Sequence, residues 1–159
     1  MITCEIPPIR MLVLTLTGRC NFKCLYCYAS EQDPIDMTEE TAIAAVALAH
    51  VSKNQFLLQF SGGEPLLQFP LIRKVVDFVE KNHVNAQMQI QTNGALLTKD
   101  IGKWLFDHHV GIGISCDGRP ELMNSLRVSK DGDRSSQKVI QAFQNLGESN
   151  ICLLYTSPS

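Results

Sequence analysis

The sequence lacks the features that mark secreted, membrane and nucleic-acid-binding proteins. Residues 1–10 contain Glu5, Pro7 and Pro8 where a secretory signal would need an apolar core, so we do not expect disulfide bonds. The longest mostly apolar stretch, residues 41–51, is far shorter than the roughly 20 residues that span a bilayer. A net charge of −2 gives no basic face for a phosphate backbone. We therefore expect a cytoplasmic protein without a membrane segment, and the charge disfavours a nucleic-acid substrate.

The remaining composition is that of an ordinary globular protein. The chain has 159 residues, of which 45% are hydrophobic and 19% charged, and it contains no internal repeat or low-complexity segment. This length is sufficient for one domain with a hydrophobic core. The chain is therefore expected to be one domain, or a part of one.

Hydrophobic patterns of strand and helix type alternate along the chain. Expected strands cover residues 11–17, 56–60, 86–91 and 110–115, and a fifth begins at residue 151. Expected helices follow the first four strands, one after an N-cap at Thr38, one through residue 81, one after an N-cap at Thr98, and one over residues 136–146. This order predicts successive β/α units.

All four helices have a predicted apolar face. In the first helix the face contains Ile43, Val46, Ala47 and, at its flank, His50. In the second helix it contains Leu71, Val75, Phe78 and Val79, and the third is marked by Ile101, Trp104, Leu105 and His108. In the last helix the face contains four apolar residues and Gly147 ends the helix; the four are Val139, Ile140, Phe143 and Leu146.

Three of the six cysteines, Cys20, Cys24 and Cys27, lie within eight residues in a C-x3-C-x2-C arrangement. Three thiolates can converge on one soft metal centre, whereas a closed zinc site or an ordinary iron–sulfur cluster takes four ligands. A [4Fe-4S] cluster held by three thiolates would have one open iron, which can bind a cofactor such as S-adenosylmethionine (SAM).

The other cysteines stand alone, so a zinc ribbon with a second C-x2-C pair is not expected. We interpret Cys4 and Cys116 as small buried hydrophobic residues. Cys4 is nevertheless a possible fourth ligand, which leaves a four-cysteine structural metal site as an alternative.

Three short motifs follow the next expected strands. Residues 62–65 read Gly-Gly-Glu-Pro, residues 91–94 read Gln-Thr-Asn-Gly, and residues 115–118 read Ser-Cys-Asp-Gly. Paired glycines let the backbone approach a ligand closely, and a carboxylate suits a cation better than a phosphate. A glycine pair alone would be interpreted as a simple strand-to-helix turn.

Together with the cysteines, these motifs resemble those of the radical SAM superfamily, in particular its peptide- and protein-modifying branch of anaerobic sulfatase maturases, whose members often continue into a SPASM domain. The resemblance covers roughly residues 10–150. It implies an α/β fold, a partial (β/α) barrel truncated after about four units. Residues 1–150 would then be an incomplete radical SAM core domain, and residues 151–159 a truncated or non-native tail.

The resemblance also implies a set of site residues. Cys20, Cys24 and Cys27 would hold the [4Fe-4S] cluster. The turn at residues 62–65 would hold the ammonium group of SAM, and Arg127, whose guanidinium suits a carboxylate, would pair with the carboxylate of SAM. The full set of predicted cofactor-binding residues is Tyr26, Gly62, Gly63, Glu64, Gln91, Asn93, Ser115, Asp117 and Arg127. No protein side chain is predicted to be catalytic, because the cofactors carry the hard step.

In the implied mechanism, the reduced cluster donates an electron to SAM, and the resulting 5′-deoxyadenosyl radical abstracts hydrogen from a peptide or protein. The implied partners are that substrate and an electron donor such as flavodoxin or ferredoxin. One departure is that Met123 and Asn124 stand where the branch usually has a His-Asp pair. The alternatives are a radical SAM enzyme acting on nucleic acid and a non-catalytic metal-binding module. The 159-residue chain alone is expected to be inactive on a peptide.

Overall fold

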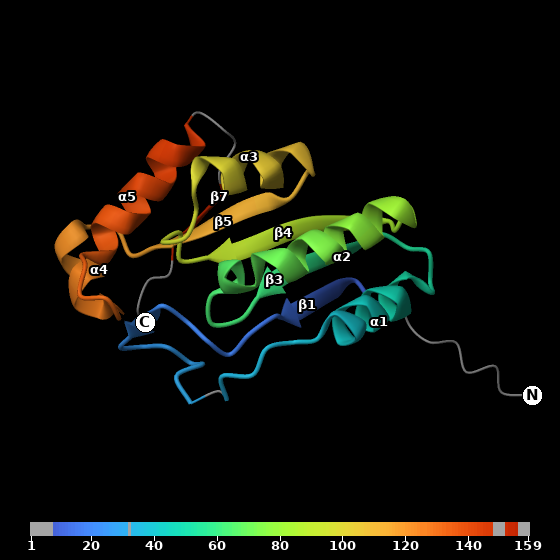
Figure 1. The fold of residues 1–159 in the computed structure, drawn as a ribbon, viewed down its shortest axis with the longest axis horizontal. Coiled ribbons are helices and arrows are strands. Elements are labelled where there is room, and N and C mark those ends of the chain that lie inside the picture. Colours follow the sequence, from blue (N-terminus) through green and yellow to red (C-terminus); the bar gives the residue numbers. More distant parts are fainter. Residues whose placement is uncertain (1–7, 32, 148–151, 156–159) are drawn as a thin grey trace, which may run out of the picture.

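The centre of the fold is a parallel β-sheet, seen in a computed structural model that describes residues 8–31, 33–147 and 152–155. Within these residues the sheet has five strands in the order β1-β3-β4-β5-β7 (Figure 1). The strands are β1 (Met11–Thr15), β3 (Phe56–Ser61), β4 (Ala86–Thr92), β5 (Gly111–Cys116) and β7 (Cys152–Tyr155). Neighbouring strands are parallel throughout, which confirms the predicted α/β fold.

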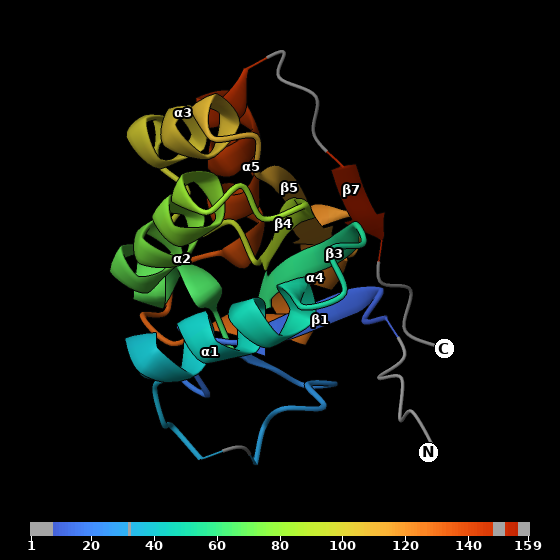
Figure 2. The same cartoon turned by 90° about the vertical axis from the view of Figure 1, so that its right-hand side faces the viewer.

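Four helices pack on one face of this sheet, as Figure 2 shows most clearly. They are α1 (Glu39–His50), α2 (Phe69–Lys81), α3 (Lys99–Asp107) and α5 (Ser135–Leu146). Alternate strand residues such as Leu14, Phe60 and Ile90 are buried, as expected for one face covered by helices. Among the described helices, none is long and apolar enough to cross a membrane.

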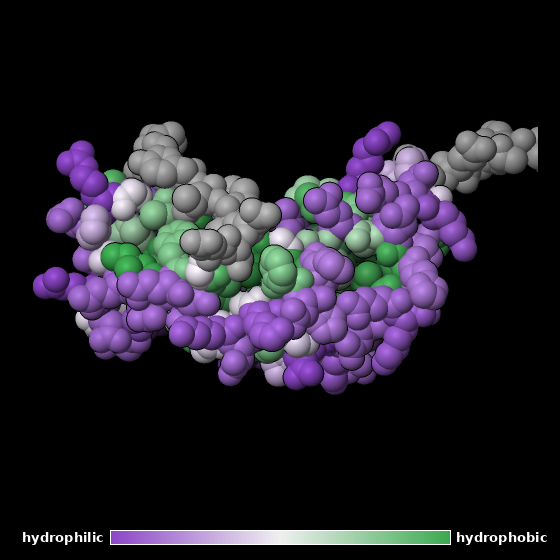
Figure 3. All heavy atoms as spheres, turned by 90° about the horizontal axis from the view of Figure 1, so that it is seen from above, coloured by the Kyte–Doolittle hydropathy of each residue, from purple (hydrophilic) through white to green (hydrophobic). Residues whose placement is uncertain are grey.

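The other face of the sheet carries polar side chains in its centre. Gln59 on β3 and Gln89 and Gln91 on β4 alternate with the buried residues and are half-buried. Figure 3, which shows the molecule of Figure 1 from above, has hydrophilic side chains along one side and hydrophobic side chains accessible in the middle. This face of the sheet is therefore polar at its centre, in contrast to the buried face under the helices.

The predicted caps are confirmed, whereas part of the predicted helix faces is wrong. Thr38 and Thr98 accept hydrogen bonds from the first turns of α1 and α3, and Gly147 ends α5. In α1 the residues that are fully buried are Ala42, Val46 and Ala49, and Ala47 is exposed. Residues 42–49 are all apolar, so their periodicity cannot select one face.

In α5 the error has a different cause. Ile140 is 48% exposed, and the small residue Ala142 is buried in its place, with Val139 and Leu146 on the same side. The helix therefore packs closely through a small side chain, whereas the sequence pattern favoured the larger aliphatic one.

Four short elements were not predicted. They are β2 (Phe22–Cys24), the 3-10 helix η1 (Pro65–Gln68), α4 (Pro120–Leu126) and β6 (Arg127–Ser129). β2 and β6 form an antiparallel ribbon in which Phe22 pairs with Ser129 and Cys24 with Arg127. Strands of three residues carry too little alternation to be detected from sequence. The ribbon joins the cysteine segment to the chain that follows β5.

Candidate functional site

The sequence motifs lie on loops at the carboxyl ends of β1, β3, β4 and β5, all at one edge of the sheet (Figure 1). Because neighbouring strands are parallel, loops that are far apart in sequence meet there. Side-chain hydrogen bonds then connect each loop to at least one other, as the following contacts show.

The cysteine segment places three half-buried thiols on one loop, with Cys24 at the end of β2 and Cys20 and Cys27 on either side of it. The backbone N–H of Phe22 donates to Cys20 Sγ at 3.3 Å. Burial raises the pKa of the Cys20 thiol, and it raises the pKa of Cys24 to about 11, an effect that Arg127 opposes and the other two thiols reinforce.

This donor set fits an iron–sulfur cluster. Cysteine thiols are the ligands that iron–sulfur clusters take, and the three on this loop would hold a [4Fe-4S] cluster with one iron left open. Among the described residues, no three Cys, His, Asp or Glu side chains gather closely enough for a single metal ion. Cys4 lies outside the described residues, so its predicted burial and the four-cysteine alternative remain predictions.

The glycines at residues 62 and 63 are required by the protein's own packing. A Cβ atom on Gly63 would lie 2.3 Å from the carbonyl oxygen of Arg19, and one on Gly62, whose φ is 140°, would lie 2.5 Å from that of Thr17. The N–H of Gly63 donates to Thr17 O at 2.8 Å, and the N–H of Glu64 donates to Arg19 O at 2.9 Å. The glycines were predicted to let the backbone approach a ligand closely. In the structure they let the backbone at residues 62 and 63 approach residues 17–19, the segment that leads into the cysteines.

Glu64 joins two of the motif loops and is completely buried. Its carboxylate accepts hydrogen bonds from the N–H of Leu66 at 3.1 Å, from Thr92 Oγ1 at 2.7 Å and from the N–H of Asn93 at 2.8 Å. Burial raises the pKa of Glu64, and these three hydrogen bonds oppose that rise. The predicted contact between this carboxylate and SAM remains a prediction.

Asn93 connects the loop after β4 to the cysteine segment. Its Nδ2 donates to Asn21 Oδ1 at 2.8 Å and lies 3.7 Å from Cys20 Sγ. On the same loop edge, Gln91 Nε2 donates to Ser115 Oγ at 3.0 Å. The structure therefore brings Asn93 close to Cys20, and Gln91 close to Ser115. All four are predicted site residues, and the two members of each pair are far apart in sequence.

Asp117, Arg127 and Tyr26 form a second connection, in which Asp117 and Arg127 are buried and Tyr26 is 40% exposed. Asp117 accepts two hydrogen bonds from Arg127, from Nε to Oδ2 at 2.8 Å and from Nη2 to Oδ1 at 2.9 Å. The Tyr26 hydroxyl donates to Asp117 Oδ2 at 2.5 Å, and the Arg127 guanidinium carbon lies 5.4 Å from the centre of the Tyr26 ring. Burial tends to lower the pKa of Arg127, but the bonds to Asp117 raise it overall. The carboxylate paired with Arg127 in this structure belongs to the protein.

Sequence reasoning missed a further set of contacts that fix the start of the cysteine segment. Thr17 Oγ1 donates to Asp36 Oδ1 at 2.6 Å, and Arg19 donates to both oxygens of Asp36, at 3.0 Å from Nε and 2.6 Å from Nη2. The Thr17 bond, followed by the contacts with Arg19, holds the pKa of Asp36 below its usual value. No local motif signals this contact, because the partners lie on either side of an irregular loop.

The departure at residues 123 and 124 also has a structural role. Asn124 Oδ1 accepts the N–H of Ser136 at 3.0 Å and so satisfies a donor in the first turn of α5. Met123 is buried, and its sulfur lies 3.7 Å from that of Cys116, which is half-buried against the core. These residues support the helix packing on this side of the site.

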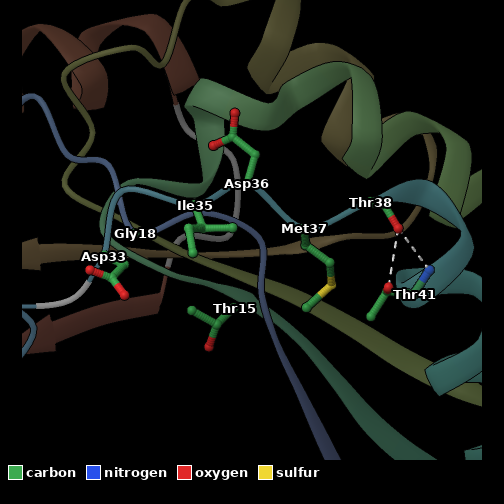
Figure 4. Close-up of a pocket in the computed structure, with 8 residues that line it drawn as sticks. All are labelled: Thr15, Gly18, Asp33, Ile35, Asp36, Met37, Thr38 and Thr41. Carbon is green, nitrogen blue, oxygen red and sulfur yellow. Dashed lines mark hydrogen bonds between the residues drawn. The ribbon is translucent and has the colours of Figure 1, made fainter.

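A pocket of about 490 Å³ lies beside the start of α1 (Figure 4). It is lined by Thr15, Gly18, Asp33, Ile35, Asp36, Met37, Thr38 and Thr41. Ile35 and Met37 point to one side of their segment, and Asp36 points to the other, toward its partners Thr17 and Arg19. The lining includes none of the predicted cofactor-binding residues.

Comparison with known proteins agrees with this geometry. The family model of the radical SAM superfamily matches residues 14–156, and the chain belongs to this superfamily, whose members use a [4Fe-4S] cluster and SAM. An uncharacterized protein of Methanocaldococcus jannaschii, MJ0907, is 39% identical over 142 residues, covering 88% of this chain and 49% of that protein. A cysteine-type anaerobic sulfatase-maturating enzyme of Clostridium perfringens is 29% identical over 150 residues, covering 87% of this chain and 40% of the enzyme.

A solved structure shows the same similarity in three dimensions. Native anSMEcpe with bound AdoMet and Cp18Cys peptide superposes with a TM-score of 0.80 at 25% sequence identity, covering 92% of this chain and 42% of that one. The chain thus spans half or less of the length of these relatives. The predicted fold class and superfamily are confirmed, whereas the role of each site residue remains a prediction.

Proposed function

We propose that this chain is part of a radical SAM enzyme that cleaves SAM reductively and abstracts hydrogen from a peptide or protein, as a maturase does. One observation carries the proposal: the loops after β3, β4 and β5 are hydrogen-bonded to each other or to the segment of Cys20, Cys24 and Cys27. Such an arrangement would hold several cofactor-binding groups close to one another. The similarity to sulfatase-maturating enzymes supports the peptide or protein as substrate.

The residues that would hold the cofactors are those on the connected loops. The three cysteines would bind the cluster, and the turn at residues 62–65, Ser115 and Arg127 would hold the amino-acid part of SAM. When bound, the cluster and SAM supply the electron and the radical that takes a hydrogen atom. The protein contributes orientation, because the carboxylate of Glu64 fixes the two turns relative to one another.

Polar side chains on the helix-free face of the sheet are compatible with a peptide substrate. Gln89 Nε2 donates to Gln59 Oε1 at 2.6 Å, and both side chains are half-buried. A carboxamide offers both donors and an acceptor, the groups that pair with a peptide backbone.

We propose that an electron donor such as flavodoxin or ferredoxin supplies the electron.

The proposal is tested with the anaerobically purified chain, reconstituted with iron and sulfide and given SAM and dithionite. We expect a [4Fe-4S] absorption and EPR spectrum, and release of methionine and 5′-deoxyadenosine. Cys20→Ala should abolish the cluster, whereas the matched control Cys116→Ala should retain it. Cys4→Ala should also retain it. Zinc in place of iron, or loss of the metal in Cys4→Ala, would support the four-cysteine structural module.

A further inference from the structure

The ion pair between Asp117 and Arg127 is buried and contacts the cysteine segment. The Asp117 side chain is fully buried, and that of Arg127 is only 7% exposed. Arg127 is the partner of Cys24 across the β2–β6 ribbon, and Asp117 holds the hydroxyl of Tyr26, which lies between Cys24 and Cys27 in sequence. Both charges therefore adjoin the loop that would carry the cluster.

Charges in such a position act strongly on a nearby redox centre. Solvent screens them little, because the interaction between two charges grows as the local dielectric constant falls. The reduction potential of an iron–sulfur cluster depends on nearby charge, hydrogen bonding and solvent exposure. Reduction adds one negative charge to the cluster, so a nearby cation favours reduction and a nearby anion opposes it.

We propose that the Asp117–Arg127 pair sets the reduction potential of the cluster, with Asp117 as a positioning residue that offsets the charge of Arg127 beside Cys24. This inference rests on the proposed function, since it requires a cluster on the three cysteines. It adds a role for Arg127 that is independent of SAM. The bidentate bond fixes the guanidinium where its charge reaches the cysteine loop, and the carboxylate limits the effect of that charge.

The test is a redox titration of the reconstituted chain without SAM, with dithionite as the source of the single electron and EPR of the reduced cluster as the readout. Asp117→Asn removes a negative charge, so the potential should rise above that of the wild type. Arg127→Gln removes a positive charge, so the potential should fall below it. The double variant should return close to the wild-type value.

Opposite signs separate a charge effect from structural damage. Loosening of the loop would shift both single variants in the same direction, which would overturn the proposal, as would unchanged potentials. The matched controls are Lys103→Gln and Asp107→Asn, which neutralise an ion pair that is largely exposed on α3 and should leave the potential unchanged. The charge-retaining variants Asp117→Glu and Arg127→Lys should lie closer to the wild type than the neutral variants.

If one single variant fails to bind iron, the other is compared with its own charge-retaining variant, Asp117→Glu or Arg127→Lys. A shift of the expected sign in the neutral variant alone supports the proposal, and an equal shift in both overturns it. Loss of iron from both would assign the pair a purely structural role and overturn the proposal. Failure of the proposed function is distinguished by the wild type, which would then bind no [4Fe-4S] cluster. A wild-type cluster whose potential does not respond to the two charges would overturn this inference alone.

Discussion

Cys24 and Arg127 are direct partners across the antiparallel ribbon of β2 and β6. One residue belongs to the cysteine segment and the other follows the Ser-Cys-Asp-Gly motif at residues 115–118. Their pairing means that backbone hydrogen bonds hold these two parts of the site together. The hydroxyl of Tyr26 reinforces the connection through Asp117.

Replacing Tyr26 by Phe should destabilise the cysteine loop. The variant keeps the ring against Arg127 but removes the hydrogen bond to the buried Asp117, and a bond to a charged group contributes about 1.5–3 kcal/mol. Urea unfolding should show a decrease of about 1.5 kcal/mol in the free energy of unfolding. Tyr28→Phe is the matched control, because Tyr28 is 87% exposed in the same loop. Equal losses in both variants would contradict the role of the bond.

Gly63→Ala should disrupt the fold around residues 62–65. The new Cβ would overlap the backbone carbonyl of Arg19, which no side-chain movement can relieve. We expect a loss of several degrees in the melting temperature, followed by circular dichroism, and weaker cluster retention after reconstitution. Gly111→Ala is the control, since its nearest atoms would lie at an ordinary 3.6 Å. A Gly63→Ala protein as stable as Gly111→Ala would show that the turn can move.

Removing the Glu64 side chain should cost more stability than removing an exposed carboxylate. Glu64→Ala leaves three donors in the interior without their acceptor, and each unsatisfied group costs about 1–3 kcal/mol. The free energy of unfolding in urea should fall by at least about 3 kcal/mol. Glu31→Ala, at an exposed position of the cysteine loop, should change it little. If Glu64→Ala unfolded at the wild-type urea concentration, the bonds would not hold the two turns together.

The contact between Asp36 and Thr17 should make stability depend on acid pH. The pKa of Asp36 is lowered in the folded state from an ordinary value of 3.8, so the stabilisation is complete above that value and is lost as the pH falls through the folded pKa. The wild type should be more stable than Asp36→Asn at pH 7, and the difference should shrink at pH 3. Urea midpoints at both pH values measure it. A constant difference would mean that the carboxylate charge is not involved.

The alternating pattern of the strands and the capping residues Thr38 and Thr98 made most of the fold predictable, because these signals are local. The motifs also indicated which loops meet, since carboxyl ends of parallel strands share an edge. The buried face of α1 was not predictable, because residues 42–49 are apolar on every side. The contact of Arg19 with Asp36 was missed because it spans an irregular loop. The pairing of Cys24 with Arg127 was missed because strands of three residues carry too little alternation to be detected.

The β2–β6 ribbon also orders events during synthesis of the chain. Residues 22–24 leave the ribosome long before residues 127–129, and the antiparallel pairing cannot form until both are available. Closing such a long loop has an entropic cost that local contacts avoid. The nascent cysteine segment therefore exists first without its strand partner, and a cluster delivered at that stage would meet a loop still lacking the contacts from Asp117 and Arg127. The ribbon that completes this site can therefore form only after residues 127–129 have been synthesised.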